Sequence, residues 1–374
     1  MKLILSEEQE FLRDTAKSFV NEKTPISHFR SLRDNNHINL WDEDVWNEMV
    51  KLGWSGILIP EEYGGSNFGV AGISVILQEC GKNLTPSPLL GTAVLGAYAI
   101  STFGTDEQKK KYLPQIVSGK ITTSIAIDES THHNPSDTNL QANYKNDKKF
   151  LLNGKKLMVM DGASSDVTII LARTSGNKGD ITGLSLFIVE TDNPNIKINK
   201  LSMADSRNYA NIECHGLEVT EKNLLGDLES GGDIINKILD IGRICLSAEM
   251  LGNTESAFEK TLDYLKERKQ FGVPIGSFQA LQHRAAEMFC EIELTKSAVI
   301  AALKAADSNS NDIERMASLA KSMVGATLHL VSNESIQMHG GIGVTDEYDI
   351  GFFLKRARVA EQLFGSTNYH KERY

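Results

Sequence analysis

The chain has 374 residues, of which 41% are hydrophobic and 24% charged, and its formal net charge is −10. A single hydrophobic core stops growing at roughly 250–300 residues, so two or three domains are expected. The acidic balance and the lack of a long basic run argue against binding to nucleic acid or to an anionic membrane surface.

The four cysteines give no sign of a disulfide framework or of a metal site. They are far apart in the sequence and form no C-x-x-C pair: Cys80, Cys214, Cys245 and Cys290. This pattern favours reduced thiols in a cytoplasmic protein. The apolar run in MKLILSEEQEFL is too short for the core of a signal peptide, and no stretch of about 18 apolar residues predicts a membrane span.

The first 120 residues have helical patterns. Ser6 and Gln9 fit a capping box ahead of an amphipathic stripe, which predicts a helix that begins after Ser6. The segment WDEDVWNEMVKLG predicts a second helix that ends at Gly53. Further helical stretches surround Gly81 and Gly104. We therefore predict an N-terminal helical domain over residues 1–120.

Residues 121–228 have a different pattern. Short β-rich runs are separated by turns rich in Asn, Asp, Gly and Ser: TTSIAI, KKFLLNG, DVTIILAR, GLSLFIVET and ANIECHGLEV. Because no helix-length pattern lies between these runs, they predict a small antiparallel β domain and not a βαβ sheet.

Residues 229–374 return to helical periodicity. Apolar residues from Ile234 to Leu265 fall mostly on one stripe, which predicts a helix over 232–269 about 57 Å long. Two or three further helices predict a bundle. The order is helical, then β, then helical, which indicates the α+β class.

A corner between two predicted helices has the composition of an anion site. In ERKQFGVPIGSFQALQHR, residues 267–284, one helix is expected to end at Gly272 and the next to begin near Ser277. The corner carries a cation, two amides and an aromatic ring: Arg268, Gln270, Gln279 and Phe271. Such groups can hold a pyrophosphate by charge-assisted hydrogen bonds while the aromatic side chain packs against a ring. The alternative is an ordinary turn between two helices that binds no ligand.

A glycine-rich segment, QMHGGIGV at residues 337–344, follows a helical pattern and not a strand. It therefore fails the context test for a Rossmann dinucleotide fingerprint. It is either a turn between helices or a backbone surface that a nucleotide approaches closely.

These segments, with their order and spacing, resemble the acyl-CoA dehydrogenase family of flavoproteins almost from end to end. The similar stretches are LGWSGILIPEEYGG, GTDEQKKKYLPQIVSG, NGKKLMVMDG, ERKQFGVPIGSFQALQHRAAEM and QMHGGIGVTDEYDI. The resemblance implies an N-terminal α-helical domain, a central antiparallel β-barrel or sandwich and a C-terminal four-helix bundle.

The resemblance also implies FAD, an acyl-CoA or related acyl thioester as substrate, and an electron-transfer flavoprotein as acceptor. It implies a homo-oligomer or assembly with a second acyl-CoA dehydrogenase-like subunit. In the family the flavin lies between the β domain and the bundle, and its nucleotide end reaches a neighbouring subunit. The implied nucleotide contacts are Arg268, Gln270, Phe271, Gln279, Gln337 and Gly341.

Two segments depart from the family pattern around the flavin ring. AIDESTHHNPSD, residues 126–137, stands where the family has T-E-P-x-x-G-S-D, so Asp128 replaces a threonine while Ser136 fits. The resemblance makes both residues candidate flavin contacts. In MVMDG, residues 158–162, Met158 stands in place of the flavin-side tryptophan of W-I-T-N-G and Met160 in place of its threonine.

Two adjacent histidines, His132 and His133, lie in the first of these segments. Because no cysteine or carboxylate has metal-ligand spacing to them, we expect solvent-exposed loop residues and no metal site.

The family reaction needs a carboxylate that takes the α-proton of the thioester while hydride leaves the β-carbon for the flavin. By the resemblance this base falls on Phe364, and its other family position, just before Arg243, is Gly242. Neither residue can accept a proton. Weak substitutes are Glu249 and Glu361, and Arg243 is a fixed cation for the flavin or thioester.

Several functions stay open at this stage. The chain is either the base-lacking subunit of a heteromeric FAD-dependent acyl-CoA dehydrogenase or a self-sufficient dehydrogenase with another base. A flavin monooxygenase on the same fold and a non-catalytic FAD-binding or interaction subunit are the alternatives. The ERKQF corner and the HGG turn argue against a pure scaffold, which has no need for them.

Overall fold

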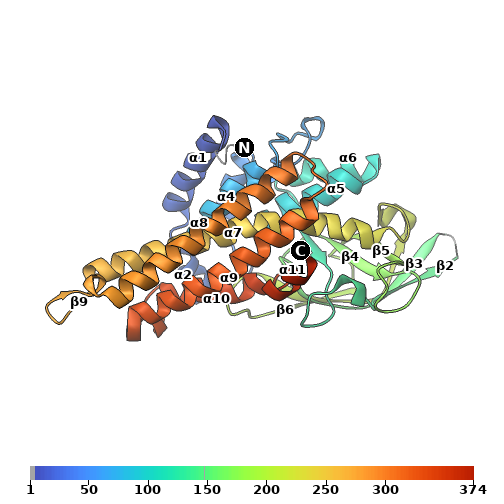
Figure 1. The fold of residues 1–374 in the computed structure, drawn as a ribbon. Coiled ribbons are helices and arrows are strands. Elements are labelled where there is room, and N and C mark those ends of the chain that lie inside the picture. Colours follow the sequence, from blue (N-terminus) through green and yellow to red (C-terminus); the bar gives the residue numbers. More distant parts are fainter. Residues whose placement is uncertain (1–4, 147) are drawn as a thin grey trace. The chain divides into compact units, whose positions relative to one another are not determined.

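The computed structural model describes residues 5–146 and 148–374, and these fall into two compact units. One unit, here the helical unit, combines the N-terminal segment up to Ser31 with Val70–Thr85 and Arg243–Tyr374. The other, here the β unit, combines Leu32–Gly69 with Pro86–Gly242. Figure 1 labels many of the elements of both units. Part of the N-terminal run that bears on the signal-peptide prediction, residues 1–4, lies outside the described residues.

The predicted N-terminal helices are present. Helix α1, Glu7–Lys23, begins with the predicted capping box, in which Ser6 and Gln9 each bond the other's backbone N–H. Helix α3, Glu43–Lys51, is followed by Gly53 with φ +80°, a conformation that costs glycine little. The other α-helices of this part are α2 (Ile26–Asp34), α4 (Val70–Lys82), α5 (Ala97–Phe103) and α6 (Asp106–Val117). A π-helical segment, η3, spans Leu89–Gly96.

The β unit is built on one sheet with the order β6-β7-β3-β2-β4-β5-β8, with β1 paired to β4. Its strands are β1 (Thr123–Ala126), β2 (Gln141–Lys145), β3 (Lys149–Met160), β4 (Val167–Arg173), β5 (Leu184–Glu190), β6 (Ile196–Lys200), β7 (Tyr209–Thr220) and β8 (Leu224–Leu225). Most pairs are antiparallel, as predicted, and each predicted β-rich run forms a strand. The β1–β4 pairing and the single β2–β4 contact are parallel.

The core of the β unit comes from the alternation of the long strands. Inward-facing residues such as Leu152, Phe187 and Ile212 are buried in one apolar cluster. Strand β3 bulges between Lys156 and Val159, and Met158 there has φ +49°. The bulge lies in the predicted flavin-side segment, and bulges commonly re-aim side chains at functional sites.

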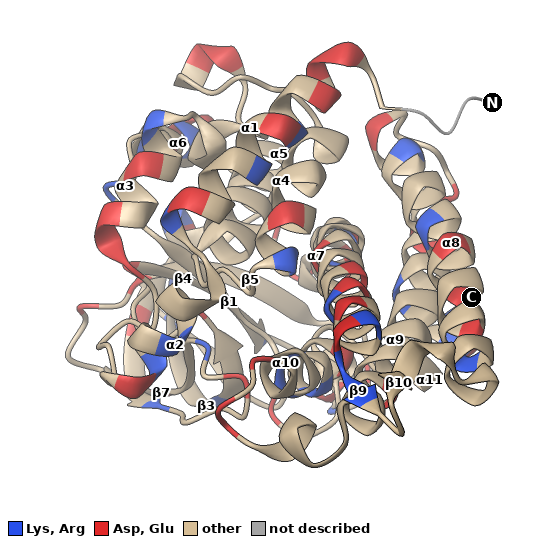
Figure 2. Cartoon of the chain, turned by 90° about the vertical axis from the view of Figure 1, so that its left-hand side faces the viewer, with Lys and Arg blue, Asp and Glu red and all other residues tan. Residues whose placement is uncertain are grey.

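The helical unit contains most of α7 (Gly231–Glu267), whose residues before Arg243 belong to the β unit. It also contains α8 (Gln279–Asp307), α9 (Ile313–His339), α10 (Ile350–Gln362) and α11 (Thr367–Arg373), with α8 packed along α9. Basic and acidic residues are interspersed on α7 and α8 (Figure 2).

Helix α4 joins the C-terminal helices because two glycines let the backbones of α4 and α7 nearly touch. A Cβ at Gly81 would lie 2.1 Å from the Glu249 carbonyl oxygen, and one at Gly252 would lie 1.9 Å from that of Gln78. Neither position can carry a side chain without separating the helices. This contact explains why the helical unit is discontinuous in the sequence.

One predicted boundary is wrong. Helix α7 ends at Glu267, not at Gly272 or residue 269, and a short antiparallel hairpin of β9 (Lys269–Gln270) and β10 (Val273–Pro274) precedes α8. Phe271 and Gly272 have φ values of +54° and +82°, the consecutive left-handed pair that a tight hairpin turn requires. Helix α8 then begins at Gln279, two residues after the predicted start.

Across the described residues, no helix is long and apolar enough to cross a membrane.

Candidate functional site

The hairpin residues predicted to bind nucleotide are presented to solvent. Phe271 is 92% exposed at the turn, and Arg268, Gln270 and Gln279 are exposed around it. In the part of the chain that the structure describes, the Arg268 guanidinium has no hydrogen-bond or ion-pair partner. The corner therefore offers an unused cation, two amides and a bare aromatic ring.

The second predicted group, Gln337 and Gly341, lies at the same end of the helical unit. Helix α9 runs antiparallel to α8, and the Arg284–Glu334 ion pair joins the start of α8 to the end of α9. The Tyr264 hydroxyl donates to the His339 carbonyl at 3.3 Å and ties the end of α7 to the same turn.

The QMHGGIGV segment forms the turn after α9, and buried His339 supports it. The imidazole stacks on Tyr264 with ring centroids 4.4 Å apart, and its Nδ1 lies 2.6 Å from the Ser335 carbonyl. Burial lowers the pKa of His339, so the ring is neutral at physiological pH. A Cβ built on Gly341 would meet nothing within 4 Å, so the backbone there is open to a ligand.

These observations fit the nucleotide part of FAD. An unpaired guanidinium and exposed amides can donate to phosphates, an exposed ring can cover a base, and a bare glycine backbone admits close approach. Bound FAD would supply the hydride acceptor, which no side chain of the chain can replace. The contacts of individual residues with the cofactor stay a prediction.

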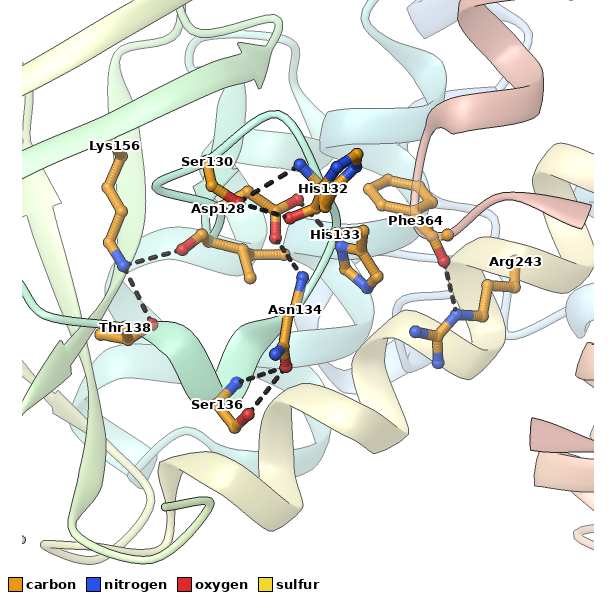
Figure 3. A network of polar contacts seen from close by, with 12 residues as sticks. Asp128, Ser130, His132, His133, Asn134, Ser136, Thr138, Lys156, Arg243 and Phe364 are labelled. Carbon is orange, nitrogen blue, oxygen red and sulfur yellow. Dashed lines mark hydrogen bonds and ion pairs between the residues drawn. The ribbon is translucent and has the colours of Figure 1, made fainter. Parts of the chain in front are cut away.

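The segment around Asp128 is a tightly bonded loop between β1 and β2 (Figure 3). One carboxylate oxygen of Asp128 lies 2.8 Å from Nδ1 of His133, and the other accepts from the Asn134 backbone N–H at 3.2 Å. The Ser136 hydroxyl donates to the Asn134 side chain at 2.7 Å. The Asp128 carboxylate thus organises its own loop, and the predicted flavin contacts of Asp128 and Ser136 stay predictions.

Two buried cations fix the rest of this loop. Fully buried Lys156 donates to Glu129 at 2.7 Å and to the Ile127 carbonyl at 2.8 Å, and burial lowers its pKa. Arg173, 2% exposed, donates to the carbonyls of Ser136 and Thr138 at 3.0 and 2.9 Å. A loop held at this many points is rigid, as a binding segment needs to be.

The two histidines of the loop differ in their surroundings. His132 is exposed, as predicted, but the His133 side chain is only 4% exposed, so the prediction of an exposed loop residue is wrong for His133. The carboxylate of Asp128, close in the sequence, draws the ring inward. No group of three metal-ligating side chains occurs within residues 5–146 and 148–374.

The backbone at Phe364 is fixed through its carbonyl oxygen. Arg243 Nε and His370 Nε2 both donate to this oxygen at 3.0 Å, and Figure 3 shows the Arg243 contact. Phe364 is 6% exposed and has φ +60°, and Gly365 after it has φ +110°. A non-glycine residue with this φ is strained, and the two donors hold it there. Because they bond the main chain, the loop geometry does not depend on the side chain at 364.

A third buried cation supports the same loop. Lys321, fully buried, donates to the carbonyls of Ala360, Glu361 and Gly365 at 2.9–3.1 Å and so caps the end of α10. Burial lowers the pKa of Lys321 to about 7. Sequence reasoning missed Lys321 and His370. Lys321 could have been found from its position, because it is a lone lysine among the apolar residues of the buried face of α9, between Ala317 and Val324.

The two weak substitutes for the base have other partners. Glu249, 8% exposed, accepts from Arg356 at 2.8 and 3.1 Å in a buried ion pair between α7 and α10. The Glu361 carboxylate accepts from the Thr367 hydroxyl at 3.2 Å and lies 3.8 Å from His329. Both arrangements favour structural roles, since a base needs an oxygen directed at the substrate.

Comparison with family models matches nearly the whole chain. The models for the N-terminal, middle and C-terminal domains of acyl-CoA dehydrogenase match residues 6–120, 126–215 and 229–374. The chain belongs to the acyl-CoA dehydrogenase family. It therefore has that family's fold, with a helical, a β and a second helical domain, and belongs to a family of FAD-dependent oxidoreductases of acyl-CoA metabolism.

Individual relatives agree with this assignment. YngJ of Bacillus subtilis, named as a probable acyl-CoA dehydrogenase, is 32% identical over 99% of this chain and 98% of its own length. The structure of butyryl-CoA dehydrogenase from Megasphaera elsdenii is 26% identical, with a TM-score of 0.91 over 100% of this chain and 98% of that chain. A variant of the steroid ACAD Tcur3481–Tcur3483 is 27% identical, with a TM-score of 0.88 over 98% and 96% of the two chains.

Proposed function

We propose that this chain catalyses FAD-dependent α,β-dehydrogenation of an acyl-CoA thioester. The observation that carries the proposal is the consecutive match of all three acyl-CoA dehydrogenase domain models. The open cationic corner around Arg268 and the bare turn at Gly341 add support, because they suit a dinucleotide.

In this proposal the chain's own residues have separate tasks. Arg268, Gln270 and Gln279 bind the phosphates, Phe271 covers the adenine, and the backbone at Gly341 accepts close approach of the nucleotide. Asp128 and Ser136 order the loop beside the ring, Arg243 fixes the loop that ends at Phe364, and an electron-transfer flavoprotein takes the electrons.

A second candidate is the base-lacking subunit of a heteromeric dehydrogenase. The aromatic side chain of Phe364 and the hydrogen of Gly242 leave both family base positions without a proton acceptor. The similarity to the steroid ACAD named for two components, Tcur3481 and Tcur3483, favours the same candidate. In that case a partner supplies the carboxylate.

The proposal is tested on the purified chain loaded with FAD. We expect a yellow protein whose flavin absorbance bleaches under anaerobic conditions when acyl-CoA thioesters of several chain lengths are added, with the enoyl-CoA product identified by mass. A chain that stays colourless, alone and with FAD supplied, would refute the proposal. Oxygen-dependent hydroxylation with reduced flavin would replace it with the monooxygenase.

A further inference from the structure

The two groups of predicted nucleotide contacts are linked by one side chain, Tyr264 on the last turn of α7. Its carbonyl oxygen accepts from the Arg268 backbone N–H at 2.8 Å, so the residue supports the corner where α7 ends. Its hydroxyl donates to the His339 carbonyl at 3.3 Å, where α9 ends. Tyr264 therefore connects the cationic corner to the glycine turn within the helical unit.

His339 is the buried centre of that turn. It stands between Gln337 and Gly341, the two contacts predicted there, and it is 3% exposed. A carbonyl oxygen can only accept, so Nδ1 of His339 donates to the Ser335 carbonyl at 2.6 Å. Nε2 has no hydrogen-bond partner among the described residues. A ring held in this way supports the turn from inside and does not itself reach a ligand.

Three rings pack around this point in a triangle. The ring centroids of Tyr264 and His339 are 4.4 Å apart, those of His339 and Tyr348 are 4.9 Å apart, and those of the two tyrosines are 6.0 Å apart. Aromatic pairs at these separations attract one another beyond the effect of the area they bury. The Tyr348 hydroxyl makes no hydrogen bond within residues 5–146 and 148–374, so the two tyrosines differ in one bond.

The turn needs this support because its own residues supply little. Gly340 has φ +63° and ψ −142°, close to the region that glycine alone adopts, and its N–H donates to the Gln337 carbonyl. A Cβ on Gly340 or Gly341 would meet nothing within 4 Å. Glycine loses more conformational freedom on ordering than any other residue, so contacts from outside the turn have to hold it ready for a ligand.

We propose that Tyr264 and His339 are positioning residues of the nucleotide site, which hold the Arg268 corner and the Gly341 turn at the spacing that the ADP part of FAD requires. This inference rests on the proposed function. Neither side chain donates to the ligand. Both act by preorganisation: when the two halves are ordered before binding, the binding free energy does not carry the cost of ordering them.

The sharpest variant is Tyr264→Phe, which keeps the ring in the triangle and removes only the hydroxyl that donates to His339. Tyr348→Phe is the matched control, because it removes the same atom from a neighbouring ring without breaking a hydrogen bond among the described residues. His339→Ala removes the third ring, and His339→Phe restores a ring that lacks Nδ1.

The readout is the dissociation constant of ADP, measured by calorimetry on the FAD-free chain, and that of FAD, with the melting temperature recorded for every variant. We expect Tyr264→Phe to raise both constants about 3–10-fold, the range that one neutral hydrogen bond can supply, and Tyr348→Phe to match the wild type. His339→Ala should bind more weakly than Tyr264→Phe, and His339→Phe should recover much of the loss. A purely structural role would lower the melting temperature and leave both constants unchanged.

A double-mutant cycle tests whether Tyr264 acts through the turn. Gly341→Ala leaves the free chain without a clash, since its Cβ would meet nothing within 4 Å, but it obstructs close approach of the nucleotide. Tyr264→Phe should therefore weaken ADP binding little further in the Gly341→Ala background, so the two losses should not add.

Other outcomes overturn the inference. It is wrong if Tyr264→Phe binds ADP and FAD as the wild type does, if Tyr348→Phe weakens them equally, or if the two losses of the cycle add. A wild-type chain that binds ADP but no flavin refutes the proposed function, and the ADP series still decides the roles of Tyr264 and His339. A wild-type chain that binds neither ligand overturns both.

Discussion

Acidification should destabilise the folded chain through one buried histidine, His370 on α11. Its side chain is 0% exposed, Nε2 donates to the Phe364 carbonyl, and Nδ1 has no hydrogen-bond partner among the described residues. Burial, with the nearby cations Lys321 and Arg243, lowers the pKa of His370 to about 2. A second proton on this ring would therefore be buried without an acceptor and beside like charges.

Proton linkage gives the direction in which the free energy of unfolding changes with pH. Above pH 6.5 the histidine is neutral in both the folded and the unfolded chain, so its contribution is constant. Below pH 6.5 the unfolded chain binds a proton that the folded chain does not bind until pH about 2, so stability falls as pH falls. The slope for one such group is about 1.4 kcal/mol per pH unit.

The expected loss between pH 7.5 and pH 5.0 is about 2 kcal/mol, because only the part below pH 6.5 counts. For a chain of 374 residues the unfolding entropy is about 0.8 kcal/mol per kelvin, so this loss lowers the melting temperature by about 2–3 °C. The assay is urea unfolding and calorimetry at fixed ionic strength from pH 5.0 to pH 7.5.

The comparison variant is His370→Gln, whose amide nitrogen reaches as far as Nε2 and can still donate to Phe364 but does not titrate. The free energy of unfolding of the wild type should fall by about 2 kcal/mol more than that of His370→Gln over this range. His215→Gln, at a 62% exposed histidine, should leave the slope unchanged. Parallel curves for wild type and His370→Gln would refute the assignment of a buried neutral imidazole.

Three further predictions concern buried polar groups. Lys321→Met leaves three buried carbonyls without their donor and should lower the free energy of unfolding by about 3 kcal/mol or more, and a urea-derived change below about 1 kcal/mol would contradict this. Arg356→Met removes the guanidinium that pairs with the buried Glu249 carboxylate and should cost about 3–5 kcal/mol, much of which the added Glu249→Met should restore in a double-mutant cycle. Asn253, 1% exposed, has no partner for either amide atom within the described residues, so Asn253→Leu should leave stability equal or higher, and a loss above about 1 kcal/mol would indicate a bridging water.

Local signals in the sequence were enough for several helices, for five of the strands and for the order of the helical and β segments. The capping box at Ser6, the glycine stop at Gly53 and the β-rich runs of residues 121–228 depend on neighbours a few residues apart, so their interpretation needed no tertiary information. The hairpin at Phe271 was missed because a positive φ at a phenylalanine is set by the turn and not by residue preference. The family also followed from the motifs and their spacing.

The tertiary structure decided which polar side chains became buried and with what. Glu249 and Arg356 are 107 residues apart, Lys321 meets carbonyls about 40 residues away, and Arg243 meets Phe364 across 121 residues. No local pattern encodes such pairs, because desolvation and the direction of a side chain depend on how the helices pack. Even His133, only five residues from Asp128, needed the folded loop to show that its ring is buried and held, since sequence proximity alone does not exclude solvent.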